Sequence, residues 1–199
     1  TLPCKDIPFG NDLRDILCDE FLNEGFKQSE LSHVAAMAIS QSSLFDVQDF
    51  IKNYFKGLKP AEFHKQIPIY NWRALFTTNY DLLIESCYES VNGAAQELSV
   101  ILDNSDRFDE TRTTNEKLLY LKLHGCVTRT HDPLLPLILT TDQYNECLNN
   151  RNRLFTHLYE LAYENTLVFV GHSLLDHNIR NVLLKLEKEA PHGQRHYLL

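Results

Sequence analysis

The sequence lacks the marks of several large protein classes. Its 199 residues contain no run of lysine or arginine, and the formal net charge is −8. Phosphate binding needs clustered cations, so this charge balance argues against a nucleic-acid surface. No stretch of about 18 apolar residues, the length a membrane-spanning helix needs, is present, and Thr1 to Cys4 do not form a signal peptide. We therefore expect a cytoplasmic protein that contacts neither nucleic acid nor membrane.

The cysteine pattern is not that of a disulfide-bonded or zinc-binding protein. Five of them stand at positions 4, 18, 87, 126 and 147, an odd number with no CxxC spacing. The sequence therefore signals neither a disulfide scaffold nor a structural zinc site, and a reducing compartment is the simpler inference. No other metal-ligand cluster is visible in the sequence, so no metal is expected.

The composition is that of one globular domain, with 43% hydrophobic and 23% charged residues over positions 1–199. Residues 11–66 form a helical section in this prediction, because apolar residues recur there at helical spacing. Helices are expected from Asn11, from about Glu30 and after Asp46. The clearest apolar stripe consists of Val47, Phe50, Ile51, Tyr54 and Phe55.

Beyond the helical section, strand-like runs alternate with helical patterns. This alternation predicts an α/β fold, with a mostly parallel sheet flanked by helices. The stretch 166–171 is a continuous β-branched and aromatic run, typical of a buried strand. The other predicted strands span residues 73–78, 97–102, 118–125 and 195–199. Helices are predicted over residues 80–91 and 142–148, over the stretch that contains Phe155, and after Ser173.

Three of the predicted strands end in small polar or titratable residues, namely Thr78-Asn79, His124-Gly125 and Gly171-His172-Ser173. The carboxyl ends of parallel strands meet at one rim of a sheet, where ligands bind. Helices starting at Tyr80 and Ser173 would point their N–H groups at an anionic ligand there.

The residue types at this rim suit positioning and proton transfer on a nucleotide-like ligand. A histidine such as His124 can act as a general base at neutral pH. The amide of Asn79 can hold a water or a sugar hydroxyl. Purely structural interpretations stay open, in which Asn79 and Ser173 cap helices and His124 is a hydrogen-bonded core residue. Asp176 is interpreted as a first-turn acid favoured by the helix dipole, and His172 has no assigned role.

Three motifs occur in this order at the predicted strand ends: Thr77-Thr-Asn-Tyr-Asp81, Leu123-His-Gly125 and Gly171-His-Ser-Leu174. In this order they resemble the sirtuin family. Their companions are Phe76-Thr-Thr-Asn-Tyr-Asp81, Leu139-Thr-Thr-Asp-Gln-Tyr144 and Phe169-Val-Gly-His-Ser-Leu-Leu-Asp176. These companions look like the bacterial sirtuin-like branch that hydrolyses NAD in antiphage defence. The resemblance covers about residues 5–199.

The resemblance implies a Rossmann-like site with NAD+ as substrate. Asn79 would match the asparagine that contacts the nicotinamide ribose and the attacking water. His124 would match the catalytic histidine, the base toward a ribose hydroxyl. Asp81 would match the aspartate that shapes the nicotinamide side, and Thr77 is expected to bind NAD+ as well. Gly171 and Ser173 would sit against the adenosine ribose and phosphates.

Two departures from the family pattern bear on function. The Gly-Ala-Gly-x-Ser turn is absent, and Ile7-Pro8 resembles the segment just after it, so we expect the given chain to start downstream of that turn. The CxxC pairs of the zinc module that deacylases carry are missing between Gly125 and Gly171. This absence favours NAD hydrolysis over protein deacylation.

The resulting expectation is an NAD+ glycohydrolase that releases nicotinamide and ADP-ribose, as an NAD-depleting effector in antiphage defence. An NAD-dependent protein deacylase is the competing enzyme. A non-catalytic module that senses NAD or ADP-ribose is the third interpretation. A homo-oligomer and an additional sensor domain or partner protein are expected, because such an activity has to be kept silent.

Overall fold

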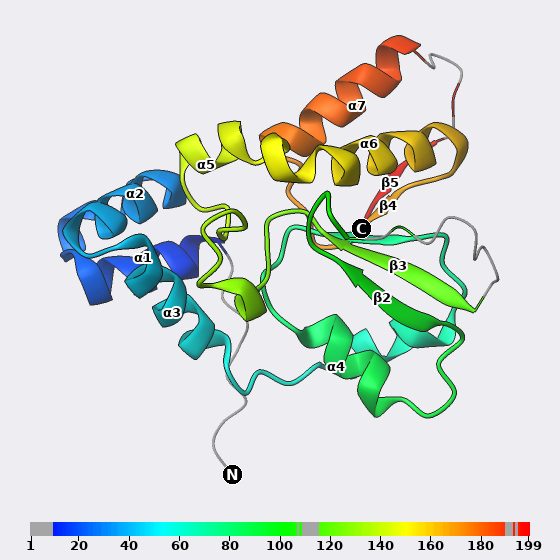
Figure 1. Ribbon diagram of the computed structural model, residues 1–199, viewed down its shortest axis with the longest axis horizontal. Coiled ribbons are helices and arrows are strands. Elements are labelled where there is room, and N and C mark those ends of the chain that lie inside the picture. Colours follow the sequence, from blue (N-terminus) through cyan, green and yellow to red (C-terminus); the bar gives the residue numbers. More distant parts are fainter. Residues whose placement is uncertain (1–9, 107, 109–115, 190–192, 194) are drawn as a thin grey trace.

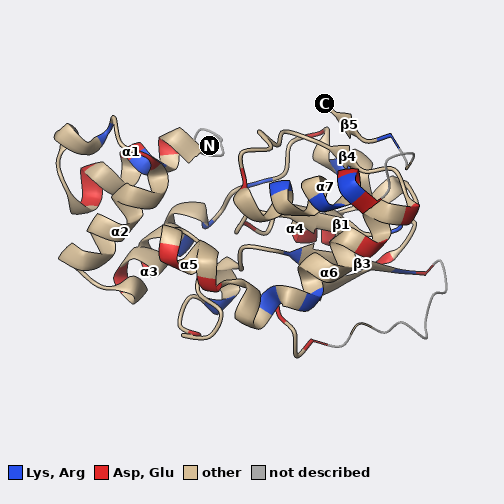
Figure 2. Cartoon of the chain, turned by 90° about the horizontal axis from the view of Figure 1, so that it is seen from above, with Lys and Arg blue, Asp and Glu red and all other residues tan. Residues whose placement is uncertain are grey.

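A computed structural model describes residues 10–106, 108, 116–189, 193 and 195–199. A group of helices from the first third of the chain stands beside an α/β part that holds the strands (Figure 1). Charged residues of both signs are distributed along both parts of the chain (Figure 2). The segment Ile7-Pro8 lies outside the described residues.

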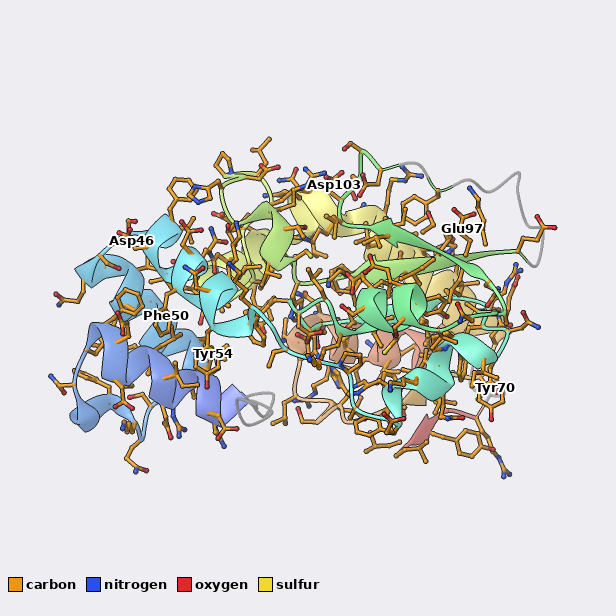
Figure 3. All side chains as sticks on the ribbon, turned by 90° about the horizontal axis from the view of Figure 1, so that it is seen from below. Asp46, Phe50, Tyr54, Tyr70, Glu97 and Asp103 are labelled. Atoms are coloured by element: carbon orange, nitrogen blue, oxygen red, sulfur yellow. The ribbon has the colours of Figure 1, made fainter. Side chains whose placement is uncertain are left out.

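Three helices make up the N-terminal part, α1 (Gly10–Phe21), α2 (Leu31–Gln41) and α3 (Leu44–Phe55). α3 begins before Asp46 rather than after it, because Ser43 caps the helix by accepting a hydrogen bond from the N–H of Asp46 at 3.1 Å. Figure 3 shows Phe50 and Tyr54 on α3, at the opposite end of the molecule from Tyr70. The fully buried residues of this part include Leu17, Val34, Ala35, Ala38, Val47 and Ile51.

A buried glutamine joins the helical part to the α/β part. The side chain of Gln48 on α3 donates to the carbonyl of Thr130 at 2.7 Å and accepts from the N–H of Leu137 at 2.6 Å. Val127, in the short 3₁₀ helix η4 (Val127–Arg129), packs into the same apolar cluster as the three helices. The segment that follows His124 is therefore held by the helical part.

The first sheet is fully parallel, with strand order β1-β3-β2. Its strands are β1 (Leu75–Thr77), β2 (Glu97–Ile101) and β3 (Lys117–Lys122). The helix α4 (Leu83–Ser90) connects β1 to β2, as expected for parallel strands. β3 is the central strand and its residues Leu118, Leu121 and Lys122 are fully buried, so its carboxyl end lies deep in the molecule.

A second parallel pair consists of β4 (Val168–Phe169) and β5 (Tyr197–Leu198). The prediction that residues 166–171 form a buried strand is wrong in its burial: Val168 is 48% exposed and Val170 is 73% exposed. The apolar run does form a strand, but it pairs through one edge with β5 while part of its surface stays in contact with solvent.

The remaining helices are α5 (Thr141–Glu146), α6 (Leu148–Glu164) and α7 (His177–Glu189), with shorter 3₁₀ turns at η1 (Glu24–Phe26) and η2 (His64–Ile69). α6 and α7 lie side by side over the strands (Figure 1). Their inner faces share one core with β2 and β3, which includes Ile101, Leu121, Leu123, Leu154, Leu158, Ile179 and Leu186. The α/β, Rossmann-like class with N-terminal helices is confirmed.

Two predicted helix starts are wrong. α4 begins at Leu83 rather than Tyr80, and α7 begins at His177 rather than Ser173. In both places an aspartate accepts hydrogen bonds from the backbone at the start of the helix, so the helix begins later than the first polar residue after the strand. The helix N-termini therefore do not start at Asn79 or Ser173.

Among the described residues, no helix is both long and apolar enough to cross a membrane.

Candidate functional site

The end of β1 makes a turn built on its own side chains. Thr77 is the last residue of the strand, and its hydroxyl accepts a hydrogen bond from the N–H of Asn79 at 3.0 Å. Asn79 itself is exposed and lies before the helix rather than capping it. Its amide is therefore presented to the surface at the strand end.

Asp81 stabilises this turn through hydrogen bonds to its side chain and its carbonyl oxygen. Its side chain is 5% exposed, and one carboxylate oxygen accepts from the N–H of Leu83 at 2.9 Å. Its carbonyl oxygen accepts a hydrogen bond from the buried ammonium of Lys122. Asp81 is thus occupied by the backbone of α4, and its described contacts are those of a residue that shapes the turn.

The end of β3 places His124 against an aspartate from a distant part of the chain. His124 Nε2 lies 3.0 Å from Asp176 Oδ2, and the two side chains are 4% and 7% exposed. The other oxygen of Asp176 accepts from the N–H of Ile179 at 2.8 Å, so Asp176 also caps α7. A capping aspartate therefore faces the predicted catalytic histidine.

Aromatic side chains form the wall around this pair. The ring of Tyr144, on α5, stands edge-on to the His124 ring with centroids 5.1 Å apart. The hydroxyl of Tyr80 donates to the carbonyl of Ile138 at 2.6 Å. Tyr144 is positioned by the capping box of α5, in which Thr140 and Gln143 satisfy each other's backbone N–H groups.

The stretch after β4 supplies the third strand end. Gly171 has a φ of +62°, and a side chain at this position would meet no atom within 4 Å. His172 accepts from the N–H of Leu174 at 2.9 Å, and Ser173 is exposed. Gly171 and Ser173 therefore lie open at the surface, on the same short loop that leads to Asp176.

The ionisation of these groups reflects burial and their mutual charges. Burial alone would raise the pKa of Asp176, but the contact with His124 and the bond from the N–H of Ile179 outweigh it and lower the pKa. Burial lowers the pKa of His172, against the attraction of Asp176. Burial and the Asp176 charge raise the pKa of Tyr144 to about 12. The carboxylate of Asp176 is consequently the charged form beside neutral Tyr144 and His172 at neutral pH.

Backbone bonds bring the strand ends together. The N–H of Leu123 donates to the carbonyl of Thr77 at 2.8 Å, and the N–H of Val127 donates to the carbonyl of Tyr80 at 3.0 Å. These bonds hold the Asn79 turn against the His124 segment, while the contact between His124 and Asp176 holds the loop of Gly171 and Ser173 to the same place.

Two residues of this arrangement were not predicted as site residues. Asp176 and Tyr144 both end motifs that carry the sirtuin resemblance, so a signal for them is present in the sequence. Their isolated patterns, an acid in a first turn and an aromatic residue on a short helix, give no reason to place them beside His124.

A family model described as SIR2-like domain matches residues 73–199, which is more than half of the chain. The chain belongs to the SIR2-like domain family. No curated protein matches it. The matched range holds every strand and all the residues assembled around His124, and it begins after α1, α2 and α3.

A SIR2-like domain implies NAD binding and NAD-dependent chemistry, and the strand ends of this SIR2-like domain are where such a ligand would lie. Within the described part of the chain, no group of three or more His, Cys, Asp or Glu side chains could hold a metal ion. The groups available at the rim are therefore an amide, an imidazole, a carboxylate and hydroxyls.

Proposed function

We propose that this SIR2-like domain is an NAD+ glycohydrolase, which cleaves the bond between nicotinamide and ribose to give nicotinamide and ADP-ribose. The observation that carries the proposal is the convergence of Asn79, exposed at the end of β1, with His124, held by Asp176 at the end of β3. This pairing supplies an orienting amide and a base at one rim.

The residues present suit the two tasks that the reaction sets. Breaking a glycosidic C–N bond passes through an oxocarbenium-like transition state, and the pyridinium form of nicotinamide is already a good leaving group. Asn79 orients the water and the ribose, and His124 accepts a proton from a ribose hydroxyl. Gly171 and Ser173, open on their loop, are the residues we assign to the adenosine side.

Hydrolysis is favoured over protein deacylation by the sequence between Gly125 and Gly171. That segment has no CxxC pair, whereas a zinc module with such pairs flanks the acyl-lysine cleft of deacylase sirtuins. We further propose that the activity serves antiphage defence by depleting NAD in the cytoplasm, within a homo-oligomer controlled by a sensor domain or a partner protein. The likeness of the strand-end motifs to defence-associated sirtuins supports this role.

The test is a product analysis with the full-length protein. Incubation with NAD+ labelled in the nicotinamide ring should release nicotinamide and ADP-ribose in equal amounts, with or without an acyl-lysine peptide. Deacylation of the peptide in step with nicotinamide release would replace the proposal by a deacylase. Tight binding of NAD+ or ADP-ribose without any cleavage, by the activated protein, would favour a sensing module.

A further inference from the structure

Asp176 has two separate duties in the structure. One oxygen, Oδ1, is used by α7, because it accepts from the N–H of Ile179 at 2.8 Å. The other, Oδ2, faces Nε2 of His124 at 3.0 Å. Capping explains the first contact but not the second, since one oxygen is sufficient for an N-cap.

The facing atoms have no other partner. Oδ2 of Asp176 and Nε2 of His124 are both enclosed, and neither makes an aligned hydrogen bond within the described part of the chain. A buried carboxylate oxygen without a donor is costly, so the arrangement favours a proton on the nitrogen that faces it. Hydrogen bonds at catalytic groups are often poorly aligned before the substrate binds and tighten in the complex.

The other groups near the pair do not compete for this role. The charge of Asp176 is also felt by Tyr80, Tyr144, Cys147 and His172. Burial raises the pKa of both phenols and of the thiol and lowers that of His172, so all four are neutral at pH 7. The guanidinium of Arg151 acts on Tyr80 and Cys147, and its bond at 2.9 Å goes to the carbonyl of Pro136.

We propose that Asp176 is a positioning residue for His124, which fixes the tautomer with the proton on Nε2. Nδ1 then carries the free lone pair and accepts the hydroxyl proton, and the carboxylate stabilises the imidazolium that results. This inference rests on the proposed function for the identity of the hydroxyl. The assignment of the tautomer stands on the contact alone.

The first experiment needs no substrate. Nitrogen NMR of the full-length protein labelled in histidine distinguishes the two neutral tautomers, with His124 assigned by the signal lost in His124→Gln. The proposal predicts that Nε2 of His124 carries the proton. A proton on Nδ1 of His124 would overturn it, whether or not the protein cleaves NAD+.

The second experiment compares two charge-neutralising variants in NAD+ cleavage. Asp176→Asn keeps the shape and can still cap α7, and Asp142→Asn removes the same charge from an exposed position on α5. Asp176→Asn should lose the His124 tautomer with the proton on Nε2, so its kcat should fall about 10²- to 10⁴-fold with KM nearly unchanged. Asp142→Asn should keep the parental kcat. A kcat of Asp176→Asn within about threefold of the parent would overturn the positioning role.

The two proposals fail in different ways. If the intact protein does not cleave NAD+, the proposed function fails while the NMR result still decides the tautomer. If the intact protein cleaves NAD+ and Asp176→Asn cleaves it equally well, only the positioning role fails.

Discussion

Lys122 and Glu85 form an ion pair beneath the Asn79 turn, with Nζ and Oε1 2.9 Å apart. The lysine side chain is fully buried, the glutamate is 16% exposed, and the same ammonium donates to the carbonyl of Asp81. A charge at the centre of the sheet is thus used to hold the loop that presents Asn79.

Replacing this lysine should destabilise the fold strongly. Lys122→Met leaves the carboxylate of Glu85 without its cation, which costs about 3 kcal/mol of unfolding free energy. The double variant Lys122→Met, Glu85→Gln should recover part of that loss, because no unpaired charge remains. Urea unfolding measures both. A double variant no more stable than Lys122→Met would contradict this account of the pair. Lys65→Met, at an exposed pair, is the control and should cost less than about 1 kcal/mol.

Gln48 should be needed to keep the helical part against the segment after His124. Gln48→Met removes both of its hydrogen bonds and leaves the Thr130 carbonyl and the Leu137 N–H unpaired, at a cost of about 2–4 kcal/mol. Hydrogen exchange should show faster exchange of the Leu137 amide. Gln41→Met, on an exposed position of α2, should change neither stability nor exchange. Unchanged exchange at Leu137 in Gln48→Met would show that the contact is dispensable.

Two glycines with positive φ provide a matched test of crowding beside His124. A side chain on Gly125 would meet the carbonyl of Pro136 at 3.0 Å and Nη2 of Arg151 at 3.2 Å, with a φ of +97°. On Gly57, with a φ of +81°, it would meet nothing within 4 Å. We expect about 1–2 kcal/mol of destabilisation for Gly57→Ala from the backbone alone. For Gly125→Ala we expect about 2–4 kcal/mol, because the clash adds to the backbone strain. Equal costs by chemical denaturation would contradict the crowding.

Stability should fall on mild acidification. Burial lowers the pKa of His172 and of His196, and each ring accepts a backbone N–H, from Leu174 and Leu167 respectively. A lowered folded pKa favours the neutral ring, so its contribution is present above the unfolded value of about 6.5. It is lost as pH falls through the folded value. Tm should therefore drop between pH 7.5 and 5.5, and less so in a His172→Gln, His196→Gln double variant. An identical drop in that variant would assign the effect to other groups.

The alternation of strands and helices was readable from the sequence because each strand run is apolar and each following helix has an apolar face. The first residues of the helices could not be predicted from the sequence, since each turn contains several residues that can cap a helix. At the first turn the aspartate of the motif, Asp81, bonds to the helix backbone, and at the last turn Asp176 does so in place of Ser173. Local propensity does not choose among these residues; the packing of the turn does.

The sequence predicts three strand ends at the rim of one sheet. β1 and β3 do end side by side in the first sheet, whereas β4 pairs with β5 in a separate sheet. His124 follows the end of β3. The contact between His124 and Asp176 was not predicted, because these two residues are far apart in the sequence and no local pattern places their side chains together. The burial of residues 166–171 was overestimated for a related reason. An apolar run indicates a strand, but whether both of its faces are covered depends on its neighbours in space.

The most direct test of the central claim is NAD+ consumption by the full-length protein, compared with Asn79→Ala and His124→Ala. Asn92→Ala, at an exposed asparagine after α4, is the matched control. Loss of the orienting amide or of the base should slow NAD+ cleavage by at least about 10²-fold, with the fold intact by circular dichroism. Asn92→Ala should keep the parental rate. Undiminished cleavage in both Asn79→Ala and His124→Ala would contradict the assignment of the site.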